Sequence, residues 1–287
     1  MERLTRSSFD GAMTNHAPIL ITGGTGKTGR RIAHLLAARD IPVRIGSRAG
    51  APPFDWERRA TWAPVLDGAR AAYIAFHPDV ALPGAAETVA AFAEQAVAAG
   101  AERLVLLSGR GEEEAQRAER AVRAVAPAAT IIRSSWFAQN FSEDFLLEDI
   151  LGGTVALPVD GVREPFVDAD DIAQVAVAAL TEDRHAGELY ELTGPRLLTF
   201  QEAVAEIGSA AGRELRFVAV RPEDYRAALD AQDLPAEVAG LVMYLFREVL
   251  DGRNEHLTDG VRRALGREPR DFRDYAAGAA ASGVWNA

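Results

Sequence analysis

The stretch that decides the fold is ILIT at 19–22, GGTGKTG at 23–29 and RRIAHLL at 30–36. A short apolar run, a glycine turn and a helical pattern, in this order, are the context that a dinucleotide-binding fingerprint requires. Glycines let the backbone turn tightly and approach a pyrophosphate, and the following helix presents free N–H groups and the positive end of its dipole. The sequence therefore predicts a phosphate-binding loop at 23–29.

A second motif overlaps this loop, because Gly26-Lys27-Thr28 is also how the P-loop of triphosphate-binding proteins ends. That motif needs a glycine five residues before Gly26, and position 21 is isoleucine. The glycines at 23, 26 and 29 have a spacing of three and three, a variant of the Rossmann turn; the alternative is a plain strand-to-helix turn. The residues predicted to bind the cofactor phosphates are Gly23, Thr25, Gly26, Lys27, Thr28 and Gly29.

The second predicted strand, at 42–46, indicates which dinucleotide is bound. In NAD-preferring domains an Asp or Glu near the end of this strand bonds the ribose hydroxyls, and none is present here. Ser47 and Arg48 follow instead, and an arginine at this place accommodates a 2′-phosphate. Lys27, the one lysine of the chain, adds a positive charge inside the loop. We predict NADP(H), with the alternative that Arg48 is a solvated loop residue.

The composition is that of an acidic globular protein. The 287 residues are 48% hydrophobic, enough for a sizeable core in one or two domains. A net charge of −11 disfavours binding to nucleic-acid phosphates. With no cysteine and five dispersed histidines, we expect neither a disulfide nor a metal site. No apolar run approaches the ~18 residues of a membrane span, and residues 1–17 lack the apolar core of a signal peptide, so a cytoplasmic location is expected.

The first half of the chain alternates strands with helices. Strands are predicted at 18–22, 42–46, 71–76, 103–108 and 130–133, with a short one near 54–56; helices are predicted at 27–39, 84–99 and 112–125. Buried parallel strands read as near-continuous apolar runs, as these do. The pattern predicts an α/β fold with a doubly wound parallel Rossmann sheet. This cofactor domain is expected to span 17–150, with 163–193 returning to it.

The second half departs from strict alternation. Helices are predicted at 141–151, 168–180, 200–211, 235–250, 255–265 and from Pro222, and strands around 155–159, 188–192 and 217–220. Asp168 is expected to cap one helix, and Thr199 with Glu202 forms a capping box for another. Residues 151–287 are therefore expected to form mostly a smaller α+β lobe on the substrate side, and residues 1–16 a flexible tail.

Several segments together resemble the NmrA-like group of atypical short-chain dehydrogenases. They are GGTGKTG at 23–29, SR at 47–48, FDW at 54–56, LVLLSG at 104–109, IIRSSWFAQNFSE at 131–143, REPFVDADDIAQVAVAAL at 163–180 and ELTGPRLLTFQEAV at 191–204. The ergot-alkaloid reductases, of the festuclavine and agroclavine dehydrogenase type, similarly show a GKT loop, W-F-x-x-N-F-S-E and P-F-V-x-A-D-D-I-A. The likeness covers roughly residues 18 to 275. It implies the Rossmann fold and NADP(H), in a group that spans iminium, quinone and other reductions and includes non-catalytic NADP sensors.

One pattern of ordinary short-chain dehydrogenases is missing, the Tyr-x-x-x-Lys pair on the helix after the fifth strand. The residues four positions after the tyrosines at 73, 190, 225, 244 and 275 are His77, Gly194, Leu229, Glu248 and Ala279. The usual alcohol–ketone mechanism is therefore not encoded. The resemblance tolerates this absence, since an iminium carbon already carries positive charge and accepts hydride without a protein acid.

Five further residues are candidates for cofactor contact because they lie near the ends of predicted strands. Asp55 and Trp56 are expected to flank the adenine, or to be packed at a strand end. Phe76 and His77 are expected to pack against the cofactor, with packing favoured over an acid role for His77. Ser108 is expected either to touch the nicotinamide ribose or to cap the next segment.

The candidate substrate pocket is formed by residues after the sixth strand and on a C-terminal helix. Trp136, Phe137 and Asn140 follow the strand at 130–133, where the nicotinamide end should lie. Met243 and Tyr244 lie on the helix at 235–250. The alternative for these aromatic and apolar residues is a place in the core.

The sequence predicts an NADPH-dependent reductase that transfers hydride to a small planar electrophile of iminium, quinone or enone type. The alternative is a non-catalytic NADP-binding regulator or redox sensor of NmrA type, which would act through a protein partner. An epimerase or dehydratase on the same fold is disfavoured by the missing Tyr-Lys pair. Catalytic residues are not assigned.

Removal of the Arg48 side chain tests the choice of cofactor. A hydrogen bond to a charged group contributes roughly 1.5–3 kcal/mol, so wild-type protein should bind NADPH more tightly than NADH. Arg48→Ala should narrow that gap, as measured by titration calorimetry. Equal affinities of the wild type for the two cofactors would contradict the assignment.

Overall fold

The computed structural model describes residues 17–232 and 236–286, so the predicted tail at 1–16 lies outside the described residues. The chain divides into two compact units. The first contains the chain up to Ser108 together with Glu113–Ile132 and Ala173–Tyr190. The second contains Gly109–Glu112, Arg133–Ile172 and the chain from Glu191 onward. The assignment of cofactor and substrate roles to separate domains stays a prediction.

A six-stranded sheet confirms the predicted Rossmann-type α/β fold. Its order is β2-β1-β3-β4-β5-β8, with strands β1 (Ile19–Thr22), β2 (Val43–Gly46), β3 (Ala71–Ile74), β4 (Arg103–Gly109), β5 (Thr130–Ser134) and β8 (Leu189–Leu192). The chain leaves β1 for its neighbour β2 and then crosses to β3 on the other side, with parallel pairing in each case. This reversal of direction beside β1 is the switch point at which open α/β sheets bind ligands.

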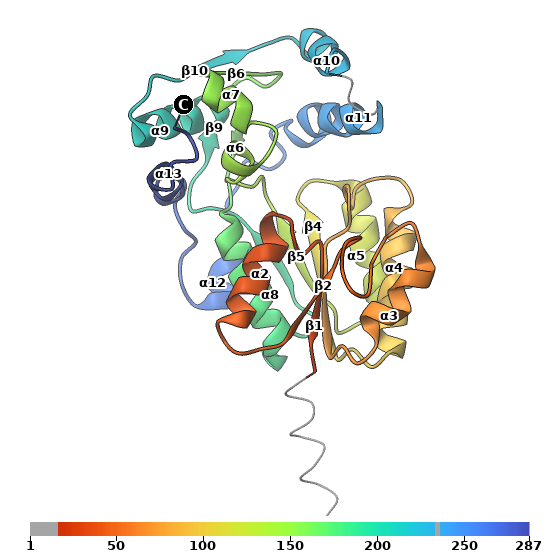
Figure 1. Cartoon of the computed structure of the whole chain (residues 1–287). Coiled ribbons are helices and arrows are strands. Elements are labelled where there is room, and N and C mark those ends of the chain that lie inside the picture. The colour runs from red at the N-terminus through yellow and green to blue at the C-terminus, as the bar shows by residue number, and fades with distance from the viewer. Residues whose placement is uncertain (1–16, 233–235, 287) are drawn as a thin grey trace, which may run out of the picture. The chain divides into compact units, whose positions relative to one another are not determined.

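Helices cover both faces of this sheet (Figure 1). One face carries α2 (Lys27–Ala37) and α8 (Ala169–Thr181); the other carries α3 (Trp62–Leu66), α4 (Ala85–Ala98) and α5 (Glu113–Val125). Single turns of 3₁₀ helix lie at Arg59–Thr61 and Asp183–His185. Strands buried on both faces must be apolar throughout, and all four residues of β1 and of β3 are buried.

The second unit is built from short elements. Its strands pair as β6 (Thr154–Leu157) with β10 (Arg216–Ala219) and as β7 (Arg163–Glu164) with β9 (Leu198–Thr199). Its helices are α6 (Asn140–Glu143), α7 (Leu147–Gly152), α9 (Phe200–Ala211), α10 (Pro222–Asp230), α11 (Ala236–Tyr244), α12 (Gly260–Leu265) and α13 (Phe272–Ala281). A π-helical segment, Leu245–Val249, continues α11.

An aromatic core holds the second unit together. Phe141, Phe166, Phe200 and Phe272 are buried and lie ring against ring. The buried Trp285 adds its indole, whose Nε1–H donates to the carbonyl of Phe141 at 2.9 Å. Burial of such side chains is the main stabilising contribution, since each large apolar group contributes about 1.5–3 kcal/mol when fully buried. The C-terminal helix is therefore part of this core.

Local helix signals are confirmed where the predicted contacts lie within one turn. Thr199 accepts a hydrogen bond from the N–H of Glu202, whose carboxylate accepts from the N–H of Thr199, so the capping box forms. Asp168 accepts from the N–H of Asp170 at the start of α8. Pro222 is the first residue of α10. Among the described residues, no helix is both long enough and apolar enough to cross a membrane.

Three predictions of secondary structure were wrong. Residues 54–56 form no strand, because Phe54 and Trp56 pack into an aromatic cluster with Trp62 and Phe92. The single helix predicted over 141–151 is two short helices, α6 and α7. The strand predicted around 155–159 is β6, at Thr154–Leu157, and it pairs with β10. Helix α13 was not predicted at all.

Charged residues of α5 also take partners on neighbouring elements. Arg117 pairs with Glu114, one turn away at 2.8 Å, and with Glu87 on α4. Glu119 is buried, and Arg123 donates to the carbonyl of Gly187. Spacing on a helix brings two charges within reach, but the neighbouring elements decide which partner each one takes.

Candidate functional site

The glycine loop between β1 and α2 has a geometry that only glycine permits at two positions. Gly23 adopts a φ of +63°, in the left-handed region, and its carbonyl accepts a hydrogen bond from the N–H of Gly26 at 2.9 Å. A Cβ added to Gly29 would lie 2.3 Å from the Gly23 oxygen. The helix can therefore start directly against the strand end only because residue 29 has no side chain.

The start of α2 is open at this loop. Gly26 is the N-cap residue and makes no side-chain capping bond, and both Thr25 and Gly26 are exposed. The first N–H groups of a helix lack intrahelical partners, and the helix dipole is positive here. Lys27, half-buried, is the first helical residue. An anionic diphosphate fits this arrangement, because the loop supplies uncapped donors and no side chain fills the approach.

The Thr28 hydroxyl is buried and accepts a hydrogen bond from the phenol of Tyr73 on β3 at 3.0 Å. A P-loop uses the hydroxyl at this place to bind Mg²⁺. Here the hydroxyl faces the protein interior, which is a second reason, besides glycine spacing, to disfavour a triphosphate site. Contact between Thr28 and a cofactor phosphate stays a prediction.

Ser47 and Arg48 lie directly after β2, where the sequence placed the 2′-phosphate. Arg48 is exposed, and the carbonyl of Ser47 accepts from the N–H groups of Gly50 and Phe54. These two bonds hold the turn that carries Arg48. A surface depression of about 500 Å³ lies on the outer side of β2, but it is lined by residues 42–45, Gly50, Ala51 and Pro18 and contains no predicted site residue.

The candidate adenine residues belong to an aromatic cluster. The ring of Trp56 lies 5.0 Å from that of Phe76, 5.0 Å from that of Phe92 and 4.9 Å from that of Phe54. Asp55 organises the same turn, since its carbonyl accepts from the Trp62 indole at 3.0 Å. Trp56 and Phe76 remain half-buried, and His77 is exposed beyond the end of β3. Contact with the adenine stays a prediction for all four candidates, Asp55, Trp56, Phe76 and His77.

Ser108 forms a hydrogen bond inside the protein. Its hydroxyl is buried and donates to the Glu119 carboxylate of α5 at 2.6 Å. The bond explains why a glutamate is buried on a helix whose other charges are solvated: a buried carboxylate needs a donor. Contact between Ser108 and a nicotinamide ribose stays a prediction.

The candidate substrate residues of the second unit pack against different neighbours. The Trp136 ring lies 5.5 Å from that of Phe200 and 5.6 Å from that of Phe246, and its indole Nε1 has no hydrogen-bond partner among the described residues. Phe137 bridges to Val167, and Asn140 opens α6. Met243 instead packs into a small separate cluster with Leu229 and Ala239. Tyr244 is half-buried at the end of α11.

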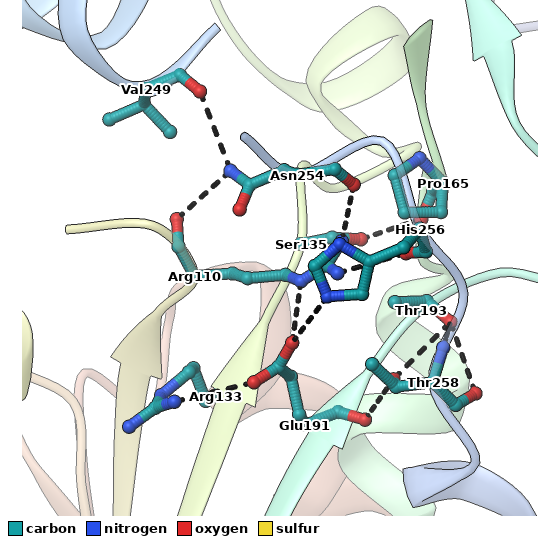
Figure 2. A network of polar contacts seen from close by, with 10 residues as sticks. All are labelled: Arg110, Arg133, Ser135, Pro165, Glu191, Thr193, Val249, Asn254, His256 and Thr258. Atoms are coloured by element: carbon teal, nitrogen blue, oxygen red, sulfur yellow. Dashed lines mark hydrogen bonds and ion pairs between the residues drawn. The ribbon is translucent and has the colours of Figure 1, made fainter. Parts of the chain in front are cut away.

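A buried arginine that sequence reasoning missed organises the carboxyl ends of β4, β5 and β8 (Figure 2). Arg110, directly after β4, donates to Glu191 at 2.7 Å and to the carbonyls of Asn254 and His256 at 2.8 and 2.9 Å. Arg133 reaches the other oxygen of Glu191 at 3.3 Å. The network attaches the strap 249–258 to the strand ends. The partners of Arg110 lie 81 to 146 positions away from it in sequence, so no local sequence pattern predicts them.

Glu164 on β7 is a second buried ionisable residue outside the predicted site. Only 2% of it is exposed, and its Oε1 has no hydrogen-bond partner in the described part of the chain. Burial raises the pKa of this carboxyl to about 8; Arg110 opposes the rise, and Glu255 adds to it. The group is therefore protonated in the folded protein at neutral pH. No cluster of three His, Asp or Glu side chains that could hold a metal occurs among the described residues.

Comparison with known proteins establishes the family. No family model matches the chain. It is 34% identical over 281 residues to an uncharacterized oxidoreductase, YesF, of Bacillus subtilis, covering 94% of this chain and 97% of that protein. It is 31% identical to agroclavine dehydrogenase of Claviceps fusiformis, covering 90% and 95%. The chain belongs to the family of oxidoreductases that contains YesF and agroclavine dehydrogenase. The predicted resemblance and enzyme class are confirmed.

Solved structures of NADP(H)-binding proteins share the fold. The NADPH complex of the quinone oxidoreductase QOR2 from Escherichia coli matches with a TM-score of 0.74 at 18% identity, over 91% of this chain and 99% of that one. The NADP complex of the transcriptional regulator NmrA matches with a TM-score of 0.67 at 16% identity, over 92% and 95%. Both were crystallised with the cofactor class that the loop predicts.

Replacement of Glu164 tests its proton. A carboxyl has an ordinary pKa of about 4.3, and the folded protein holds the proton up to about pH 8. Between these values the folded state binds more protons than the unfolded state, so wild-type stability falls as pH rises. Glu164→Gln cannot ionise, so its Tm relative to wild type should rise from pH 5 to pH 8.5. A gain of about 3 °C or more is expected, since 1 kcal/mol corresponds to roughly 2–4 °C.

Glu214→Gln, at an exposed carboxylate of the same unit, is the matched control. Its Tm relative to wild type should change little over the same pH range. A Glu164→Gln difference that is the same at both pH values would show that Glu164 is ionised in the folded protein.

Proposed function

We propose that this oxidoreductase is an NADPH-dependent reductase that transfers hydride to a small planar electrophile of iminium, quinone or enone type. The observation that carries the proposal is the glycine loop, where Gly29 lies against the Gly23 backbone and the start of α2 is left uncapped. Two similar proteins support it, since a relative is an agroclavine dehydrogenase and a protein of the same fold is an NADPH-dependent quinone oxidoreductase.

The cofactor would be held mainly by backbone groups and two cations. The N–H groups at the start of α2 would bind the pyrophosphate, with Lys27 beside them. Arg48, on the turn fixed by Ser47, would pair with the 2′-phosphate. Bound NADPH supplies the hydride. The contribution of the chain is then binding and orientation, which alone can account for a large part of a rate enhancement.

The contacts of four tyrosines, Tyr73, Tyr190, Tyr225 and Tyr275, support a mechanism without a phenol as proton donor. Tyr73 donates to Thr28, and Tyr275 donates to Ser142 at 2.8 Å. The phenol of Tyr190 pairs with His185 at 2.8 Å. Burial, with a contribution from the Asp149 carboxylate, raises the pKa of Tyr225 to about 12, which makes that phenol a weaker acid.

A substrate that is already electron-poor removes the need for such a donor. General acid catalysis contributes about 10²–10⁴-fold, and an iminium carbon gains little of it because the positive charge is present in the ground state. Trp136 and Phe137 would supply an aromatic wall for a planar substrate, with Asn140 and Tyr244 beside it. Met243 packs within its own cluster, so we give it a supporting position.

The experiment that tests this proposal is NADPH oxidation, followed at 340 nm, against cyclic imines, quinones, enones and simple ketones. Imines and quinones should react, and simple ketones should react poorly, because a neutral carbonyl without a proton donor loses most of its rate. Conservative changes of Tyr225, Tyr244 and His77 should lower kcat only modestly.

Two results would overturn the proposal. A loss of more than about 10²-fold in kcat at one of these three positions, with cofactor affinity intact, would identify a proton donor. Tight NADPH binding without turnover of any substrate in the panel would instead favour the regulator or redox sensor, which works through a protein partner.

A further inference from the structure

A buried tyrosine supports the phosphate loop from the neighbouring strand. Tyr73 lies on β3, with none of its surface exposed, and its phenol donates to the hydroxyl of Thr28 at 3.0 Å. Thr28 is the second residue of α2, so this bond ties the first turn of the helix to the centre of the sheet. The N-cap residue, Gly26, supplies no side-chain capping bond to this turn.

The same strand also fixes the other end of the loop. The hydroxyl of Thr22, the last residue of β1, donates to the carbonyl of Tyr73 at 3.1 Å and accepts from the N–H of Ala75 at 2.8 Å. A Cβ on Gly23 would lie 3.4 Å from the Cβ of Ala75. The segment 23–28 is thus anchored to β3 on both sides, at Thr22 before the turn and at Thr28 after it.

The Tyr73 phenol keeps its proton for this bond. Burial raises the pKa of this phenol well above its usual range, and the bond to Thr28 only partly offsets the rise. At neutral pH the phenol is therefore protonated and available to donate to the Thr28 hydroxyl.

We propose that Tyr73 is a positioning residue for the cofactor: its bond to Thr28 sets where the first N–H groups of α2 meet the pyrophosphate. The inference rests on the proposed function, because it concerns how the loop binds NADPH. The phenol itself faces Thr28 from within the sheet, so the effect passes through the helix start. A site whose supporting residues are loosened binds its ligand less well even when all its own groups are present.

The test is a double-mutant cycle in NADPH affinity, measured by titration calorimetry on the full chain. Tyr73→Phe removes the donor, and Thr28→Val removes the acceptor at nearly constant volume. Each single variant should raise the Kd for NADPH about three- to tenfold, as the loss of one neutral hydrogen bond implies. The NADPH Kd of the double variant should be about that of the weaker-binding single variant, since both changes break the same hydrogen bond.

Tyr190→Phe is the matched control. Tyr190 is also buried, on β8 of the same unit, and its phenol pairs with the His185 side chain at 2.8 Å. This variant should lower Tm by an amount similar to Tyr73→Phe while leaving the NADPH Kd within about twofold of wild type, since one neutral hydrogen bond is lost in each. A steady-state comparison should show the Tyr73→Phe defect in KM for NADPH, with kcat nearly unchanged.

The outcomes separate this inference from the proposed function. Wild-type protein that fails to bind NADPH would overturn the function and this inference with it. Wild-type binding with an unchanged Kd in Tyr73→Phe and Thr28→Val would leave the function standing and show that the bond is only structural. If Tyr73→Phe does not fold, an unchanged Kd in Thr28→Val alone gives the same contradiction.

Discussion

The constraint on which the cofactor loop depends is the approach of two backbone segments where β1 turns into α2. A Cβ at residue 29 would lie 2.3 Å from the Gly23 oxygen, so the helix can start against the strand only with glycine there. That approach leaves the first turn of α2 uncapped at an exposed edge. The uncapped turn is what allows a diphosphate to bind, and the binding of NADPH is what the proposed chemistry requires.

Much of the first unit could be predicted because its signals are local. The apolar runs of β1, β3, β4 and β5, the glycine turn and the helix caps at Asp168 and Thr199 are each set by residues within a few positions of one another. The exceptions are places where tertiary packing overrides local preference. The segment 54–56 has strand-like residues, but its aromatic rings pack into a cluster with Trp62 and Phe92.

The roles of individual polar residues were harder to predict, because their partners lie far away in sequence. Thr28 has the spacing of a phosphate ligand, yet its hydroxyl bonds Tyr73, 45 positions later. Glu119 on α5 is buried and accepts from Ser108 at the end of β4. The network of Arg110 joins residues up to 146 positions apart. A sequence shows which residue types are present, whereas the choice among distant partners is decided by burial and by the need to satisfy every buried polar group.

The central claim is that the loop at 23–29 binds NADPH, and Gly26→Val tests it most directly. Residue 26 is exposed and has extended backbone angles that valine adopts, and its Cβ would lie 3.2 Å from the Gly23 oxygen, which requires a shift of a few tenths of an ångström. The added side chain covers the uncapped helix start. Titration calorimetry should show NADPH binding to wild type and none to the variant, with the Tm of the two proteins nearly equal. Normal NADPH binding by a folded Gly26→Val protein would contradict the account.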